Sequence, residues 1–154
     1  MKIRIISIGK LKKKFILNSL AEYQKKIRPF NVNLEFIELK EGIGKDKNLI
    51  IAQEEKIIES KIDSSSYSFV LSVEGKQFSS EDFADNFQNL MNRGNSKFDF
   101  YIGGPYGLTR EFEEKFNQKF SLSKMTMPHD LVRLFLTEQI YRAFSILNGT
   151  EYHK

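Results

Sequence analysis

Cysteine is absent from the 154 residues, which excludes disulfides, thiolate metal sites and cysteine nucleophiles. No apolar run approaches the ~20 residues that a membrane-spanning helix needs. The opening MKIRIISIGK alternates apolar and polar residues too early for a signal peptide. With 40% hydrophobic and 29% charged residues, the composition is that of a globular protein. We therefore expect one domain over 1–154, located in the cytoplasm, with no membrane partner.

Positive charge is in mild excess, with a net charge of +4. Lys10, Lys12, Lys13 and Lys14 lie in one short stretch, and further basic residues follow at positions 25–28. Contacts with a phosphate backbone need only charge and reach, so this distribution fits a nucleic-acid footprint. A lysine-rich face exposed to solvent explains it equally well, and the sequence leaves both interpretations open.

Strand and helix patterns alternate along the chain. Strands are predicted at 1–9, 32–36, 67–73, 98–102 and 120–122, and helices at 16–27, 50–62, 83–91, 109–116 and 131–147. Ser79 and Asp82 have the spacing of a helix-capping box. The polar segment EGIGKDKN (41–48) is expected to be a mobile loop. This alternation predicts an α/β fold with a mainly parallel sheet.

The last predicted helix is apolar around nearly its whole circumference. Such a helix must be buried on more than one side. In a domain of this size, a second subunit is one way to cover the additional side, and a twofold homodimer is the commonest arrangement. A central position within the core of one chain is the alternative.

Ligands of open α/β sheets bind beyond the carboxyl ends of the strands. The loop GGPYGL (103–108) lies at such a position, and its glycines allow backbone amides to approach a ligand. The sequence carries neither the dinucleotide-binding nor the phosphate-loop glycine motif. Leu122, Met125 and Met127 supply flexible apolar contacts suited to adenine or a thioether. A tight turn and the packing of a sheet edge explain the same residues without a ligand.

Polar residues interrupt the start of the last helix. His129 is expected to be a packing histidine, because no residues with metal-ligand spacing accompany it, and Asp130 is expected to cap the helix. Arg142 can pair with Glu138 four residues earlier. Arg133 has no partner at that spacing and is therefore the better functional candidate. No metal is expected.

Four segments together resemble a known family. They are IISIGKLKKKF (5–15), VLSVEGKQFSSEDFA (70–84), YIGGPYGL (101–108) and FSLSKMTMPHDLVRLFLTEQIYRAFSILNGTEYHK (120–154). With the overall length, they resemble the ribosomal RNA large-subunit (pseudouridine-N3) methyltransferases, the RlmH family of the SPOUT superfamily. The resemblance covers the whole chain.

The resemblance implies a SPOUT-type α/β domain whose C-terminal part forms a trefoil knot, a feature that pattern alone does not predict because knots are rare. It also implies S-adenosylmethionine as methyl donor and a homodimer with its active site at the subunit boundary. The implied substrate is the assembled ribosome. There, N3 of the pseudouridine at position 1915 of 23S ribosomal RNA, or its equivalent, would be methylated.

The resemblance also implies site residues. The cofactor-binding set would be Leu71, Gly103, Leu122, Ser123, Lys124, Met125, Thr126 and Met127. Tyr152, His153 and Lys154 match the family's catalytic tail, although some relatives carry Arg at the last position. His153 would act as a base, and Tyr152 would stack on or orient the target base. Arg133 and Lys154 would steady negative charge or grip phosphate.

Two other functions remain open at this point. A non-catalytic ribosome-binding or RNA-binding factor of the same fold would use the same basic surface without binding the cofactor. A flavodoxin-like binder of a phosphorylated ligand would use the glycine loop instead. The sequence leaves undecided whether the Tyr-His-Lys tail acts as a base or positions the substrate, and which lysines contact RNA.

Overall fold

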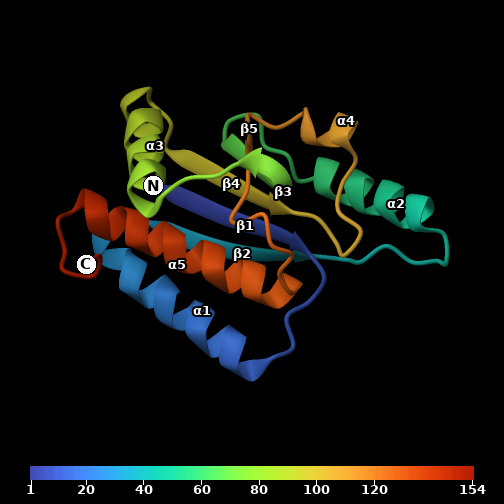
Figure 1. Ribbon diagram of the computed structural model, residues 1–154, viewed down its shortest axis with the longest axis horizontal. Helices are drawn as coiled ribbons and strands as arrows, with labels where there is room; N and C mark the ends of the chain where they lie inside the picture. The colour runs from blue at the N-terminus through green and yellow to red at the C-terminus, as the bar shows by residue number, and fades with distance from the viewer.

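Five strands form one wholly parallel sheet in the order β2-β1-β4-β3-β5 in the computed structural model, which describes residues 1–154 (Figure 1). The strands are β1 (Lys2–Ile8), β2 (Asn33–Leu39), β3 (Tyr67–Lys76), β4 (Lys97–Ile102) and β5 (Gln118–Phe120). The helices are α1 (Lys14–Ile27), a 3₁₀ turn η1 (Arg28–Phe30), α2 (Lys47–Glu59), α3 (Ser80–Asn92), α4 (Arg110–Glu113) and α5 (His129–Leu147). The predicted α/β class and parallel sheet are confirmed.

Both faces of the sheet are covered, which explains why its strands read as nearly continuous apolar runs. In β1, Ile3 and Ile5 belong to the core shared with α1, α3 and α5, whereas Ile6 and Ile8 belong to the core shared with α2 and α4. Phe69 and Phe100 stack in the first core, with ring centroids 4.5 Å apart. No helix combines the length and the apolar character that crossing a membrane requires.

Most predicted elements are present, with shifted boundaries. The expected strand at 120–122 lies at 118–120. The expected helix at 109–116 is only four residues long, and Thr109 caps its start. Ser79 caps α3 as predicted, accepting a hydrogen bond from the Asp82 amide. The loop expected at 41–48 is shorter, since α2 begins at Lys47. Hydrogen bonds join Gly42 and Ile43 to the Glu54 and Gln53 side chains of α2.

The prediction that Asp130 caps α5 is wrong. The helix begins at His129, its N-cap position is Pro128, and no side chain caps it. Asp130 lies within the first turn, where its carboxylate is 3.3 Å from the Lys13 ammonium group. A carboxylate at this position still interacts favourably with the helix dipole, so a pattern of charge near a helix start cannot locate the cap itself.

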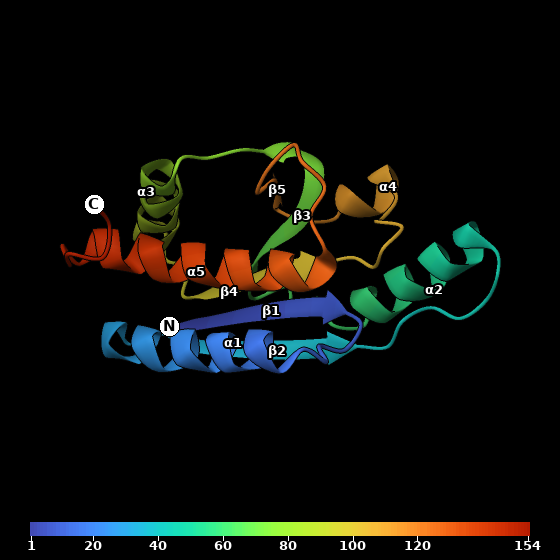
Figure 2. The same cartoon turned by 60° about the horizontal axis from the view of Figure 1, so that its bottom comes forward.

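Helix α5 runs antiparallel to the strands, from their carboxyl ends to their amino ends. Its first turn lies at the carboxyl ends of the strands, where Arg133 binds the Ile8 carbonyl at the end of β1. Its last turns lie at the amino ends, where Tyr141 packs against Phe30, just before β2. Figures 1 and 2 show the C-terminus at the end of α5 that lies away from the strand tips. Nineteen helical residues span about 28 Å.

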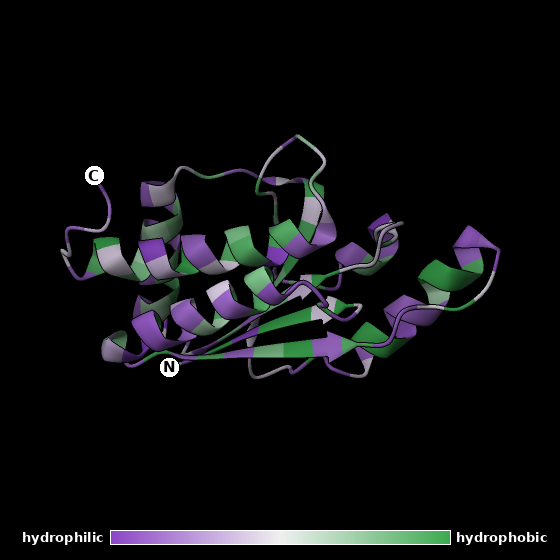
Figure 3. Ribbon diagram, turned by 90° about the horizontal axis from the view of Figure 1, so that it is seen from below, coloured by the Kyte–Doolittle hydropathy of each residue, from purple (hydrophilic) through white to green (hydrophobic).

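Helix α5 lies between α1 and α3 on one face of the sheet (Figure 2). On the side of α5 that faces the sheet, Leu136, Ile140 and Ala143 are completely buried. On its outer side, Leu131 remains 41% and Phe135 44% exposed. Figure 3 shows hydrophobic stretches along α5 that alternate with polar ones. The sheet, α1 and α3 of the same chain therefore cover three sides of this apolar helix. A partly apolar strip on its outer side is left uncovered.

Candidate functional site

A cavity of about 460 Å³ lies at the carboxyl edge of the sheet. Three segments form most of its wall, namely 71–74 in the second half of β3, 102–108 from the end of β4 onward and 120–127 between the end of β5 and the start of α5. Its volume is typical of a small-molecule site. The sheet topology explains its place, because parallel strands direct the loops that follow them to the same edge.

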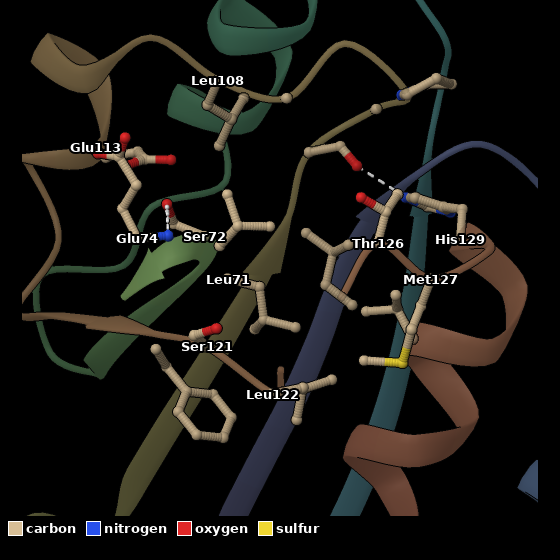
Figure 4. A pocket seen from close by; sticks show the side chains of 18 of the residues that line it. Leu71, Ser72, Glu74, Leu108, Glu113, Ser121, Leu122, Thr126, Met127 and His129 are labelled. Atoms are coloured by element: carbon tan, nitrogen blue, oxygen red, sulfur yellow. Dashed lines mark hydrogen bonds between the residues drawn. The ribbon is translucent and has the colours of Figure 1, made fainter. Parts of the chain in front are cut away.

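The cavity has an apolar floor with polar groups on opposite sides (Figure 4). Leu71 and Leu122 lie at its centre, and Met127 lies beside the start of α5. Glu74 and Glu113 lie toward α4 on one side, and His129 lies on the other. Such an arrangement suits a ligand that combines a flat apolar ring with cationic or hydroxyl groups.

The two acidic side chains differ in their environment. Burial raises the pKa of Glu113, which is only 7% exposed. Glu74 is exposed, and its hydrogen bond with Arg110 lowers its pKa. The Nζ atom of Lys119 lies 3.7 Å from Glu113 and gives partial compensation for the buried charge. One side of the cavity therefore carries two carboxyl groups close to its apolar floor, each beside a basic side chain.

The turn formed by Gly103 and Gly104 has no room for side chains. A Cβ atom on Gly103 would lie 2.8 Å from Leu108 Cγ, and one on Gly104 would lie 2.3 Å from Glu54 Oε2. Both distances are shorter than the contacts that real Cβ atoms make, so the close packing explains why both positions are glycine. Burial raises the pKa of Glu54, which is 1% exposed and accepts a hydrogen bond from the Gly42 amide.

Seven of the eight residues expected to bind the cofactor line this cavity. They are Leu71, Gly103, Leu122, Ser123, Met125, Thr126 and Met127. Lys124 belongs to the same loop, but its side chain is exposed and does not line the cavity. The sequence therefore located one wall of the cavity well. It missed Glu113 and Ser72, for which no local motif gives a signal, since only the pairing of β3 with β5 brings their segments together.

The expected catalytic residues do not share this cavity. Arg133 is 2% exposed, and its guanidinium group donates to the carbonyls of Ile8 and Gly9 at 2.6 and 2.8 Å. It also lies 3.4 Å from Glu38. Burial lowers its pKa. Arg133 thus has partners outside its own helix, which spacing along the helix could not reveal.

The segment Tyr152–Lys154 lies at the opposite end of α5. The Tyr152 hydroxyl donates to Glu138 Oε1 at 3.0 Å, and the Tyr152 ring packs on Tyr141 with centroids 4.7 Å apart. Burial raises the pKa of Tyr152. His153 lies between two groups, with Nδ1 3.2 Å from Arg142 Nη1 and Nε2 2.9 Å from Glu81 Oε1. Arg142 pairs with Glu138 as expected.

An open groove between α1 and α5 connects the two ends. Its lining includes Tyr23, Leu131, Phe135 and Arg142, and it also includes Met127 of the cavity wall. The apolar strip on the outer side of α5 therefore begins beside the cavity and ends beside the tail. This groove is continuous with both sets of expected functional residues.

Sequence comparison finds close relatives over the full length. A protein named Ribosomal RNA large subunit methyltransferase H in Natranaerobius thermophilus is 40% identical over 159 aligned residues, which cover 99% of both chains. A protein of the same name in Bacillus cytotoxicus is 44% identical over 160 aligned residues, with complete coverage of both chains.

Structural comparison gives the same fold. A probable methylase family protein from Haemophilus influenzae aligns with 99% of this chain and 70% of its own, with a TM-score of 0.56 and 12% identity. A putative methylase family protein from Neisseria gonorrhoeae aligns with a TM-score of 0.51 and 8% identity, covering 90% of this chain and 81% of its own. A family model described as "Predicted SPOUT methyltransferase" matches residues 1–153. The chain belongs to the SPOUT methyltransferase family.

Proposed function

We propose that this protein is an S-adenosylmethionine-dependent methyltransferase that acts on N3 of the pseudouridine at position 1915 of 23S ribosomal RNA, or its equivalent, in the assembled ribosome. The main support is the cavity at the carboxyl edge of the sheet, which is lined by seven of the eight residues expected to bind the cofactor. The names of the full-length relatives support the ribosomal substrate. Since that substrate is the ribosome, we infer that the protein works in the cytoplasm as a single domain over 1–154.

The residues of the cavity fit S-adenosylmethionine. Leu71, Leu122 and Met127 offer apolar surface for the adenine ring, and the glycine turn offers backbone groups at close range. The acidic side chains of Glu74 and Glu113 complement the ammonium and sulfonium charges of the cofactor. When bound, the cofactor supplies a methyl group that is already activated by its sulfonium centre. The protein must then hold the nucleophile in line with that methyl group.

Pseudouridine N3 carries a proton that it must lose to become a nucleophile. In the proposed mechanism, His153 accepts this proton, Tyr152 stacks on or orients the base, and Lys154 stabilises negative charge or binds phosphate. Arg142 is a donor without an acceptor atom, so it occupies the lone pair of His153 Nδ1 in this structure. The imidazole must be released from Arg142 before it accepts a proton there. We therefore expect substrate binding to move the tail away from α5.

The tail cannot reach the cavity of its own chain, because the length of α5 separates them. A second copy placed antiparallel along the groove of α1 and α5 would bring each tail to the other chain's cavity. We propose that this homodimer is the active form. The partly exposed Leu131 and Phe135 supply apolar surface for the interface. The C-terminal trefoil knot implied by the family resemblance remains part of this proposal.

The proposal is tested with ribosomes from a strain that lacks this modification. We expect calorimetry to detect S-adenosylmethionine binding, and mass spectrometry to detect one methyl group at the target pseudouridine. His153→Ala should lower the methylation rate by about 10²-fold or more, the usual contribution of a general base. Its cofactor affinity should be unchanged. The absence of S-adenosylmethionine binding, with or without ribosomes, would exclude the enzyme and favour the non-catalytic alternative. Binding of S-adenosylmethionine without methylation by the wild type would contradict the proposed target.

A further inference from the structure

Gly103 and Gly104, the glycine turn of the cavity, have no side chains to anchor them, so the position of the turn depends on its neighbours. The His129 Nε2 atom lies 2.7 Å from the Gly103 carbonyl oxygen. Figure 4 shows this contact crossing from the start of α5 to the loop after β4. It joins two of the segments that form the cavity wall. His129 is itself part of that wall.

The neighbours of His129 determine which ring nitrogen carries the proton. Arg133 Nη2 lies 3.1 Å from His129 Nδ1. The Gly103 carbonyl oxygen only accepts hydrogen bonds, so Nε2 must carry a proton, and the positive guanidinium group favours the unprotonated lone pair on Nδ1. The proton of the neutral ring is therefore on Nε2, which donates to the Gly103 carbonyl. The contact at 2.7 Å is a hydrogen bond only when Nε2 carries a proton.

Arg133 is held firmly in the orientation that selects this tautomer. Its Nη2 atom also donates to the carbonyls of Ile8 and Gly9. Its Nη1 atom lies 3.4 Å from Glu38, whose carboxylate accepts a hydrogen bond from the Leu11 amide. The guanidinium group thus joins the end of β1, the end of β2 and His129. A buried, multiply bonded arginine is suited to orienting a neighbour and not to contacting RNA.

We propose that His129 is a positioning residue of the methyl-donor pocket, whose neutral ring, oriented by Arg133, fixes the Gly103 carbonyl and with it the glycine turn. The inference rests on the proposed function, because it concerns the same cavity. Arg133 acts in this proposal through His129, which replaces the direct catalytic role expected from the sequence.

The proposal has a direct pH consequence. A protonated His129 would turn an Nδ1 hydrogen toward Arg133, so that two donors and two positive charges would face each other. The hydrogen bond to the Gly103 carbonyl favours the charged ring, as do Asp130 on α5 and Glu41 in the loop after β2, and Glu38 neutralises Arg133 from β2. Burial is the largest influence and lowers the pKa of His129. Cofactor affinity should therefore be complete at neutral pH and fall as pH drops through that lowered pKa.

Two variants at one position separate positioning from folding. His129→Gln keeps an N–H near the place of Nε2 and an oxygen that accepts from Arg133, but it does not titrate. His129→Ala removes both. We expect His129→Ala to weaken S-adenosylmethionine binding by roughly three- to tenfold, the usual value of one hydrogen bond. His129→Gln should recover most of that loss, and the methylation rate at saturating cofactor should change less than the affinity.

The experiment is calorimetric titration of the wild type and both variants from about pH 8 to about pH 5, the range in which histidine titrates. Wild-type affinity should fall with pH, whereas the His129→Gln profile should lack this component. The difference between the two profiles removes the contribution of Glu74, Glu113 and the cofactor's own groups. Nitrogen-15 spectra of the ligand-free wild type should show the Nε2–H tautomer of His129.

The possible outcomes are distinct. If the wild type binds S-adenosylmethionine and both variants match it in affinity and pH profile, the positioning role is wrong and the proposed function stands. An Nδ1–H tautomer would also overturn the positioning role. If the folded wild type does not bind S-adenosylmethionine at any pH, the proposed function and this inference both fail.

Discussion

The two ends of α5 are built in different ways. At its start, the cavity is formed mainly by loops and backbone turns from three strands of one chain. At its end, Tyr152 and His153 contact Glu138, Arg142 and Glu81 through side chains alone. The first region has the shape of a binding site, and its titratable groups, Glu74, Glu113 and His129, already have hydrogen-bond or ion-pair partners. The second has chemically useful groups that lie beside the open groove between α1 and α5 and outside the cavity at the carboxyl edge of the sheet.

This difference supports our proposal that one chain holds two halves of a site. In that proposal, the cavity provides the volume for a cofactor, and the tail provides a base, an aromatic ring and a cation. A helix of about 28 Å keeps them apart within one chain. Two chains aligned in opposite directions would complete two sites at once, which is a general consequence of twofold symmetry.

Removal of residues 150–154 should have the largest effect. The truncated protein should bind S-adenosylmethionine like the full chain, because the tail does not line the cavity. Its methylation rate should fall by about 10²-fold to 10⁴-fold, the range for loss of acid–base catalysis. Ribosome methylation and calorimetry measure the two quantities. Full activity of the truncated protein would contradict the division into two halves.

A mixing experiment sharpens the same test. A full-length Gly104→Val variant should lack a working cavity, because its Cβ would collide with Glu54. Neither this variant nor the truncated chain should methylate alone. Unfolding and refolding them together should restore activity, since mixed dimers combine an intact cavity with an intact tail. Refolded wild type is the control. No recovery in demonstrated mixed dimers would show that each chain works by itself.

Arg133→Met should mainly affect stability. The change leaves the Ile8 and Gly9 carbonyls without their donor and Glu38 without its partner. We expect the free energy of unfolding to fall by about 2–4 kcal/mol, as for other broken buried networks. Denaturant unfolding at fixed protein concentration measures this loss. Arg142→Met, at a less buried position on the same helix, is the matched control and should lose much less.

Phe135→Glu should weaken association of the two chains. The side chain is 44% exposed in the single chain and lies on the outer strip of α5. Burying a charge there in place of an aromatic ring should cost on the order of 2 kcal/mol. Analytical ultracentrifugation should show a shift toward monomer, with methylation reduced in parallel. A wild type that is monomeric while active would contradict the dimer. Leu49→Glu, 62% exposed on α2, is the control.

Lys124→Ala should have the smallest effect. The side chain is exposed and does not line the cavity, although its neighbours in sequence do. Substitutions at such positions change free energies by about 0.5 kcal/mol or less, which corresponds to a roughly twofold change in cofactor affinity. Thr126→Val is the comparison inside the cavity and should change the affinity more. A large loss with Lys124→Ala would place that side chain on the cofactor.

Local patterns predicted most elements because their causes are local. The Ser79 cap, the helical spacing from Ile16 to Ile27 and the β-branched run of β1 each involve residues close in sequence. The wrong predictions concern residues whose environment is set by contacts with residues far away in sequence. Asp130 resembles a cap, but its carboxylate pairs with Lys13. Arg133 seemed to have no partner because its neighbour four residues earlier is His129 and not a carboxylate, and its other partners are Glu38 and the carbonyls of Ile8 and Gly9.

The sequence by itself determined the parallel α/β class, the wall of the cavity that follows β5, and the likeness of the tail to a known family. These depend on periodicity, glycine positions and continuous motifs. Only the tertiary structure decided that Glu113 reaches the same cavity, that Arg133 is buried against His129, and that the tail lies at the far end of α5. Each of these depends on strand order and on the direction of one helix, which bring together residues whose separation along the chain carries no information about contact.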